Sequence, residues 1–288
     1  MQEKIDSAIL IDDNEFDFIQ KLTIFASAIL VISALWFVWS VYNGSIILMG
    51  PSQYVIEQEE TFDELIDSEK YSHLSGKGVS VCIVDSGIED SHPDLAKINL
   101  AGWTDFIGNQ SNPYDDNGHG TMMAGILVAD GGLSGLAKNV ELYVAKALSG
   151  NGTGSDSIVS QAIDWCISQN VNIISLSLGG ATTGASIIFG DAVESSVDDA
   201  YDAGIVVVAA AGNDGENDDG DVASPGTVST VICVGGVDSQ GNLWSGSSIG
   251  DNNGRIWPLL LPRNDPDRKP EIVAPGHEVH VSALLLPG

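Results

Sequence analysis

Short apolar segments rich in β-branched residues recur from Gly76 onward, and they restrict the fold more than any other feature. They occupy residues 79–84, 140–147, 171–178, 205–211 and 231–237. Helical patterns separate them at residues 120–130, 156–170 and 191–204. Continuous apolar strands that alternate with helices are typical of a mostly parallel sheet covered on both faces. We therefore predict an α/β three-layer sandwich over residues 76–288.

An uncharged stretch precedes this region at residues 22–42, LTIFASAILVISALWFVWSVY. As a helix it would span about 31 Å, close to the roughly 30 Å of a bilayer core. Trp36, Trp39 and Tyr42 gather at its far end, as interfacial aromatic residues do. A cleaved signal peptide is the main alternative, but no A-x-A site follows the stretch. We predict a retained transmembrane helix between an acidic tail (1–21) and a linker with a short helical part (43–75).

The basic residues around this helix predict its orientation. Lys4 and Lys21 precede the apolar stretch, and the next basic residue is Lys70. The positive-inside rule then places the N-terminus in the cytoplasm. We expect a single-pass protein of the cell membrane with residues 43–288, including the domain at 76–288, outside.

The overall charge limits the kinds of partner. The chain has 40 acidic and 11 basic residues and a net charge of −29. Such a surface repels phosphates, so we expect no nucleic acid partner. The three cysteines, Cys82, Cys166 and Cys233, are far apart in apolar segments and lack zinc-ligand spacing. We expect all three to be buried free thiols.

Three polar residues lie where parallel strands are expected to end, and chemistry gathers at that edge of an open α/β sheet. Asp85 follows the first strand directly, and Asn213 follows the strand at 205–211. His119 begins a helix after a glycine-rich turn, within reach of that edge. An aspartate bonded to one imidazole nitrogen leaves the other nitrogen free to act as a base. An ordinary turn explains Asn213 equally well when it is taken alone, and it is the better explanation of Asp85 or His119 alone.

Five motifs together resemble the subtilisin-like serine proteases in order and spacing. They are VCIVDSGIEDSHPDL, NGHGTMMAGI, SLSLGG, VVVAAAGN and KPEIVAPG, spread over roughly residues 76–280. The resemblance implies Asp85 as the orienting carboxylate, His119 as the general base and Asn213 as the oxyanion donor. It also implies a groove in which a peptide or protein substrate adds as a strand. The residues implied to line this groove are Gly152, Gly154, Ser177, Leu178 and Gly179.

The chain departs from the family pattern at the nucleophile. In the family a G-T-S-M-A motif follows V-A-P-G, but here Val273–Gly276 is followed by HEVHVSALLLPG, and Ser282 has the wrong context. We therefore expect the 288 residues to be inactive by themselves. Either they are a C-terminally incomplete membrane-anchored serine endopeptidase, or they form a non-catalytic relative that binds extended peptides. A nucleotide-binding domain is a third and weaker interpretation of the α/β pattern.

No cofactor is implied, and a structural calcium ion is doubtful. Asp94 matches a calcium ligand of the family, but the loop at residues 129–135 is shorter than the calcium-wrapping loop of many relatives. The acid-rich run at 213–221 lacks the register of an EF-hand and is interpreted as a solvated loop. Met122 occupies a position where the family often has a second histidine, which does not belong to the catalytic triad. Residues 251–270 are predicted to form a long surface loop.

Overall fold

The computed structural model describes residues 13–42, 51, 53–179, 192–215, 222–250 and 269–279. The chain divides into two units, Met1–Gly50 and Pro51–Gly288. Helix α1 (Asp13–Tyr42) belongs to the first unit and contains the whole predicted span at 22–42. Its part Phe16–Tyr42 is long and apolar enough to cross a membrane, a property that N-terminal signal sequences share.

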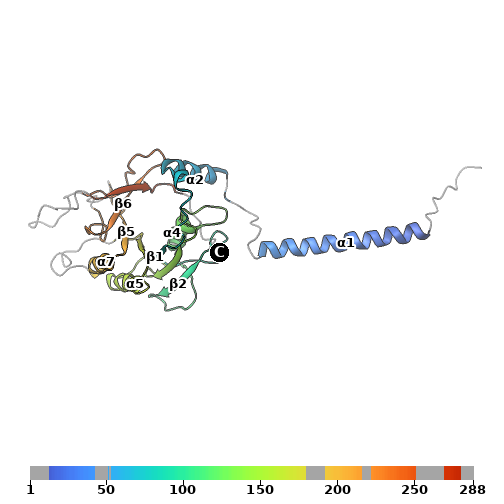
Figure 1. Cartoon of the computed structure of the whole chain (residues 1–288), viewed down its shortest axis with the longest axis horizontal. Coiled ribbons are helices and arrows are strands. Elements are labelled where there is room, and N and C mark those ends of the chain that lie inside the picture. Colours follow the sequence, from blue (N-terminus) through green and yellow to red (C-terminus); the bar gives the residue numbers. More distant parts are fainter. Residues whose placement is uncertain are drawn as a thin grey trace, which may run out of the picture. The chain divides into compact units, whose positions relative to one another are not determined.

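The second unit is built on a seven-stranded sheet with strand order β2-β3-β1-β4-β5-β6-β7 (Figure 1). The strands are β1 (Ser80–Asp85), β2 (Leu100–Asp105), β3 (Glu141–Lys146), β4 (Ile173–Leu176), β5 (Val206–Ala210), β6 (Ile232–Val237) and β7 (Ile272–Pro275). Every neighbouring pair among these strands is parallel. The five predicted apolar segments form β1, β3, β4, β5 and β6, which confirms the predicted parallel sheet.

Helices pack on both faces of the sheet at β1, whose side chains alternate between two cores. Cys82 and Val84 pack into one core with helices α5 (Asp156–Ser168) and α7 (Ala192–Asp202), which lie side by side (Figure 1). Val81 and Ile83 pack into the other core with helix α4 (His119–Val128). Residues of β1 are almost fully buried on both faces. This explains why its sequence is continuously apolar rather than alternating.

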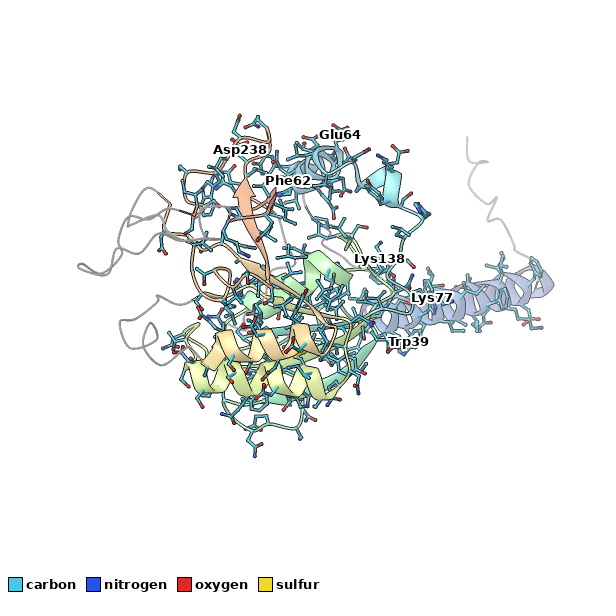
Figure 2. The ribbon with its side chains drawn as sticks, turned by 60° about the vertical axis from the view of Figure 1, so that its left-hand side comes forward. Trp39, Phe62, Glu64, Lys77, Lys138 and Asp238 are labelled. Carbon is cyan, nitrogen blue, oxygen red and sulfur yellow. A yellow bond between two sulfur atoms is a disulfide. The ribbon has the colours of Figure 1, made fainter. Side chains whose placement is uncertain are left out.

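Two helices lie N-terminal to the sheet, in the region predicted to be a linker. They are α2 (Gln53–Leu65) and α3 (Ser68–Tyr71). Figure 2 labels two residues of α2: Phe62 is buried and Glu64 is exposed. Glu59 of the same helix accepts a hydrogen bond from the Ser134 backbone N–H at 2.7 Å. The compact unit therefore extends N-terminally beyond Gly76, the boundary that the sequence predicts.

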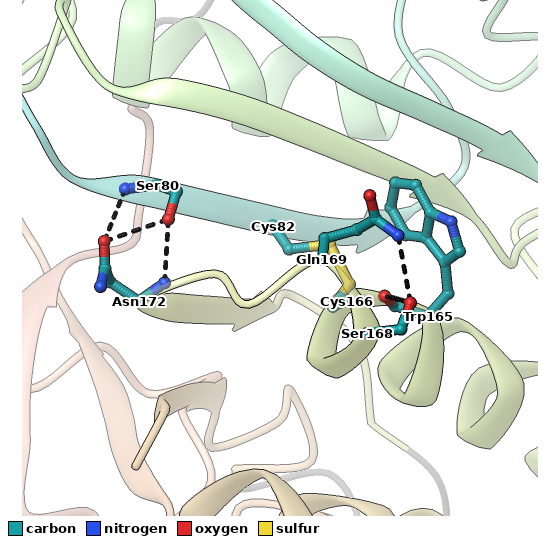
Figure 3. Close-up of a disulfide and its surroundings, with 7 residues drawn as sticks. All are labelled: Ser80, Cys82, Trp165, Cys166, Ser168, Gln169 and Asn172. Carbon is teal, nitrogen blue, oxygen red and sulfur yellow. Dashed lines mark hydrogen bonds between the residues drawn. A yellow bond between two sulfur atoms is a disulfide. The ribbon is translucent and has the colours of Figure 1, made fainter. Parts of the chain in front are cut away.

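The prediction of three free thiols is wrong for two of the cysteines. Cys82 on β1 and Cys166 on α5 form a disulfide, with their Cα atoms 5.9 Å apart (Figure 3). They are 84 residues apart in sequence, so only the packing of α5 on the sheet brings them together. Cys233 is a buried free thiol, and burial raises its pKa to about 12. The long loop at 251–270 falls outside the described residues except for 269 and 270.

The disulfide generates a prediction about thiol reactivity and stability. We expect alkylation of the denatured full chain to modify one cysteine without reductant and three after reduction. Replacing both Cys82 and Cys166 by alanine should lower the free energy of unfolding by about 2–4 kcal/mol, because the closed loop restricts the unfolded chain. Mass spectrometry and urea unfolding measure the two effects. Labelling of all three thiols without reductant would contradict the disulfide.

Candidate active site

Asp85 and His119 form the centre of the site. Asp85 is the last residue of β1, and His119 is the first residue of α4. The His119 Nδ1–H donates to the Asp85 carboxylate, with distances of 2.8 Å to Oδ1 and 3.0 Å to Oδ2. The Asp85 side chain is fully buried, whereas the His119 side chain is 38% exposed. This bond fixes the tautomer of the ring and leaves Nε2 available as a base.

The carboxylate of Asp85 changes the protonation behaviour of His119. Its hydrogen bond to Nδ1 is the main cause of a raised pKa of His119, and burial acts in the opposite direction. The charges of Asp85 and Asp115 raise this pKa further. The imidazolium form of His119 is therefore stabilised. This property suits a side chain that accepts a proton as a base.

A second aspartate, Asp115, holds the turn from which His119 projects. Its Oδ1 accepts from the backbone N–H groups of Asn117 (3.1 Å) and Gly118 (2.8 Å). Its Oδ2 accepts from both the N–H (2.9 Å) and the hydroxyl (2.7 Å) of Thr121. Burial alone would raise the pKa of Asp115, but these donors outweigh it and lower the pKa. Gly118 caps α4 without a side chain, so Asp115 supplies the missing acceptor.

The end of β1 and the start of α4 touch through their backbones. A Cβ atom on Gly120 would lie 2.1 Å from the Gly87 carbonyl oxygen, and one on Gly87 would lie 2.1 Å from the Tyr114 carbonyl oxygen. Gly87 also has φ of +123°, a conformation that favours glycine. Ser86 bridges the two segments, because its Oγ donates to Asp115 and accepts from the Gly120 N–H, both at 2.9 Å. The glycines of D-S-G and G-H-G thus allow His119 to reach Asp85.

A buried lysine that none of the sequence motifs singles out contacts the same region. Lys146 ends β3 beside Asp85 and is fully buried. Its ammonium group donates to Asp116 Oδ1 at 2.6 Å, to the Leu148 carbonyl at 2.9 Å and to the Ser86 carbonyl. A buried charge is tolerated only when it is paired and hydrogen-bonded in this way. The sequence signal for this residue is a lysine near the end of a mostly apolar segment, VELYVAKA.

The residues predicted to line a substrate groove do line one cavity. This cavity, here called the loop cavity, has a volume of 400 Å³. Its walls include His119, Gly152, Gly154, Ser177, Leu178 and Gly179. The loop that carries Gly152 and Gly154 is fixed by Asn117, whose amide donates to the Gly150 carbonyl at 3.1 Å. A cavity lined by two chain segments, one of them glycine-rich, suits an extended peptide that adds as a strand.

A second cavity, here called the sheet cavity, lies along the sheet and contains Asn213. It has a volume of 740 Å³, and His119, Ser177 and Asn213 are among its lining residues. His119 and Ser177 belong to both cavities. The turn before Asn213 is held by Ser248, whose N–H donates to the Gly212 carbonyl and whose Oγ accepts from the Asp214 N–H, each at 3.0 Å. Asn213 itself is exposed, so its amide is accessible to a ligand.

The short loop at residues 129–135 is tied to Asp94 and to two lysines by direct contacts. The loop folds directly onto Asp94, whose Oδ1 accepts from the Gly132 N–H at 2.5 Å. Lys97 and Lys138 both approach Asp130 of the same loop, at 3.9 and 3.4 Å. The Asp94 carboxylate is thus held by a backbone donor, and the Asp130 carboxylate by two lysines. Within the described residues no group of three or more His, Cys, Asp or Glu side chains is placed to hold a metal ion.

The pairing of Asp85 with His119 predicts an NMR result. We expect His119 to titrate above the ordinary pKa of about 6.5, and Asp85→Asn should lower its pKa because the ion pair and the hydrogen bond are lost. The ring C–H signals of the full chain in detergent measure this effect. A group with a raised folded-state pKa stabilises the fold below its unfolded pKa, and this contribution is lost as the pH rises through the folded pKa. An unchanged pKa in Asp85→Asn would contradict the pairing.

Comparisons with known proteins identify relatives of this chain. Residues 76–286 match the model of the subtilase family. Subtilisin DY of Bacillus licheniformis is 39% identical over 192 residues, which cover 65% of this chain and 67% of the relative. Serine protease AprX of Bacillus subtilis (strain 168) is 36% identical over 226 residues, covering 74% of this chain and 49% of the relative. Subtilisin NAT of Bacillus subtilis subsp. natto is 39% identical over 181 residues.

A solved structure shows the same architecture. A cold adapted subtilisin-like serine proteinase aligns with a TM-score of 0.57 and 27% identity, covering 73% of this chain and 67% of that one. The alignment with subtilisin NAT covers 45% of the relative's length, so the chain spans about half of several curated relatives. The family model nevertheless matches most of the sequence, including the segments that carry Asp85, His119 and Asn213. The chain therefore belongs to the subtilase family.

Proposed function

We propose that this protein is a membrane-anchored serine endopeptidase of the subtilisin type that acts outside the cytoplasm on peptides or proteins. The hydrogen bond from His119 Nδ1 to the buried Asp85 carboxylate, at the meeting point of two cavities, carries the proposal. One cavity presents the backbone of two loops to a substrate, and the other contains an exposed amide donor, Asn213. Membership of a family of serine-type endopeptidases supports the same chemistry.

In the proposed reaction, His119 moves a proton while a serine attacks the substrate carbonyl. Nε2 of His119 accepts the serine proton and later gives it to the leaving amine. Asp85 holds the ring in place and stabilises the imidazolium. The side-chain amide of Asn213 donates to the oxyanion of the tetrahedral intermediate, whose negative charge develops only as the reaction proceeds. The collapse of that intermediate forms an acyl-enzyme, which water then hydrolyses.

The serine itself does not occur in the family's motif within these 288 residues. The sheet cavity supports the proposal, because its apolar wall includes Val81, Ile83 and Val208 and it reaches His119 and Asn213. A segment that fills it could present a hydroxyl to both side chains. We therefore expect residues 1–288 to be inactive by themselves and to gain activity when the family's nucleophile segment is fused after Gly288.

Two observations support an outward-facing domain anchored by α1. The helix is uncharged over residues 22–42, and Lys4 and Lys21 lie N-terminal to that stretch. The Cys82–Cys166 disulfide favours an oxidising compartment, since thiols in the cytosol are kept reduced. We propose that Met1 lies in the cytoplasm and the peptidase domain outside.

No metal or organic cofactor takes part in the proposed mechanism. The backbone N–H of Gly132 satisfies an Asp94 oxygen that a calcium ion would otherwise bind. We propose that the shortened loop replaces calcium by direct hydrogen bonding.

Restoring the nucleophile segment allows the roles of two residues to be tested. In the fused enzyme, His119→Ala should reduce kcat by several orders of magnitude, because no other base faces the serine. Asn213→Ala should reduce kcat roughly 100-fold or more, about 3 kcal/mol, with little change in KM. Steady-state kinetics on a chromogenic peptide measures both effects.

The control is Asp214→Ala, which removes the neighbouring side chain while keeping the backbone N–H that Ser248 binds. It should retain most of the activity. If Asn213→Ala raises KM and leaves kcat unchanged, Asn213 binds the ground state and its oxyanion role is wrong. If the fused protein binds peptides without cutting them, the chain is a peptide-binding relative rather than a protease.

The topology is tested in cells that express the full chain with a different tag at each end. Protease added to intact cells should digest the C-terminal tag and leave the N-terminal tag intact, because Lys4 and Lys21 retain the N-terminus inside. Both tags should stay with the membrane fraction before digestion. Release of the domain into the medium without its N-terminal tag would instead identify residues 22–42 as a cleaved signal sequence.

A further inference from the structure

The loop cavity carries one carboxylate whose place in the site suggests substrate selection. Asp156 lines this cavity and is the first residue of α5. Its side chain is exposed at the cavity, whereas Val159, one helical turn later, is buried in the same lining. Residues three apart on a helix share a face, so the acid and the valine are directed to the same space. We propose that Asp156 makes the protease select substrates with a lysine or arginine side chain in this cavity.

The residues that line the cavity suit a lysine or arginine side chain. Val159, Leu178 and Val193 provide apolar surface in its lining, and Val159 and Val193 are only 5% and 6% exposed. Lysine and arginine have an apolar stem with a charge at the end. The stem can cover the apolar surface while the charged end reaches the exposed carboxylate at the rim. A purely apolar side chain would leave this carboxylate without a partner from the substrate.

The charges around the cavity favour a cation and disfavour an anion. Among its described lining residues, Asp156 and His119 are the ionisable ones, and neither lysine nor arginine is present. The nearby base Lys146 is fully buried and is paired with Asp116 at 2.6 Å. Behind the wall, the Ser224 hydroxyl donates to Glu194 at 3.2 Å, which adds a second acid close to the cavity. The chain's net charge of −29 acts in the same direction at long range.

The position of Asp156 also has a structural effect that must be separated from selection. An acidic residue in the first turn of a helix interacts favourably with the helix dipole. The dipole effect is measured separately, by thermal unfolding of Asp156→Asn. Asp164 controls for the loss of one negative charge from α5, because it is an exposed acid on the same helix and does not line the cavity. Asp164→Asn removes the same charge from α5 without touching the cavity.

The inference rests on the proposed function, but it can be tested by binding, which requires no nucleophile. Fluorescently labelled, blocked hexapeptides carry lysine, norleucine or glutamate at each position in turn, and anisotropy measures their Kd for the full chain in detergent. Norleucine keeps the four-carbon stem and lacks the charge. At one position the lysine peptide should bind about 3- to 10-fold more tightly than the norleucine peptide, and the glutamate peptide should bind more weakly than both. Added salt should reduce these differences in Kd. Asp156→Asn should remove the preference, Asp156→Lys should reverse it toward glutamate, and Asp164→Asn should keep it.

The outcomes separate this inference from the proposed function. Equal binding of lysine and norleucine peptides at every position would overturn the selection by Asp156 and leave the groove intact. A lysine preference that persists in Asp156→Asn would assign it to another acid and also overturn the inference. If no peptide binds at all, the groove of the proposed function fails, and the selection fails with it.

Discussion

The carboxylate of Asp115 is the contact on which the geometry of this site depends. It receives three backbone N–H groups and two hydroxyls, from Ser86 on one side and from the turn and first residues of α4 on the other. These donors belong to two segments that are far apart in sequence and lie in backbone contact at Gly87 and Gly120. Because a buried carboxylate is costly unless its lone pairs are satisfied, the network stabilises one arrangement of both segments. His119 reaches Asp85 as a consequence of that arrangement.

Lys146 is a second buried charge whose hydrogen bonds join separate segments, including the start of the loop that carries Gly152 and Gly154. Its ammonium group binds the carbonyls of Ser86 and Leu148, which follow the ends of β1 and β3, and the Asp116 carboxylate. One buried cation thus contacts the strand end that carries Asp85, the turn that carries His119 and the loop that leads to Gly152. Removing either partner of such a buried pair would leave an uncompensated charge, so the three segments are expected to keep their relative positions.

The sequence was sufficient to predict the strands whose sequence is continuously apolar, and insufficient where tertiary contacts decide. The five continuous apolar segments all form strands. Strand β2 was not predicted, because LAGWTD lies at the sheet edge, is only partly buried and contains Gly102, which lies against the ring of Tyr143. Asp85 and His119 were recognised from their motifs, but Asp115 is indistinguishable from a turn aspartate until its five donors are known. The Cys82–Cys166 pair was missed because no local pattern relates residues 84 apart.

The acidic residues of the protein divide into two groups that respond differently to salt. Asp85 and Asp115 are buried, and their charges are balanced locally by N–H groups, hydroxyls and His119, so dissolved ions have little access to them. Asp156 and most of the remaining acids on the described surface are exposed to ions, which weaken their attraction for a substrate. Salt should therefore leave the His119–Asp85 geometry unchanged while it reduces long-range attraction of cationic peptides. Asp85 and Asp156 are the same type of side chain, and burial is what separates their response to salt.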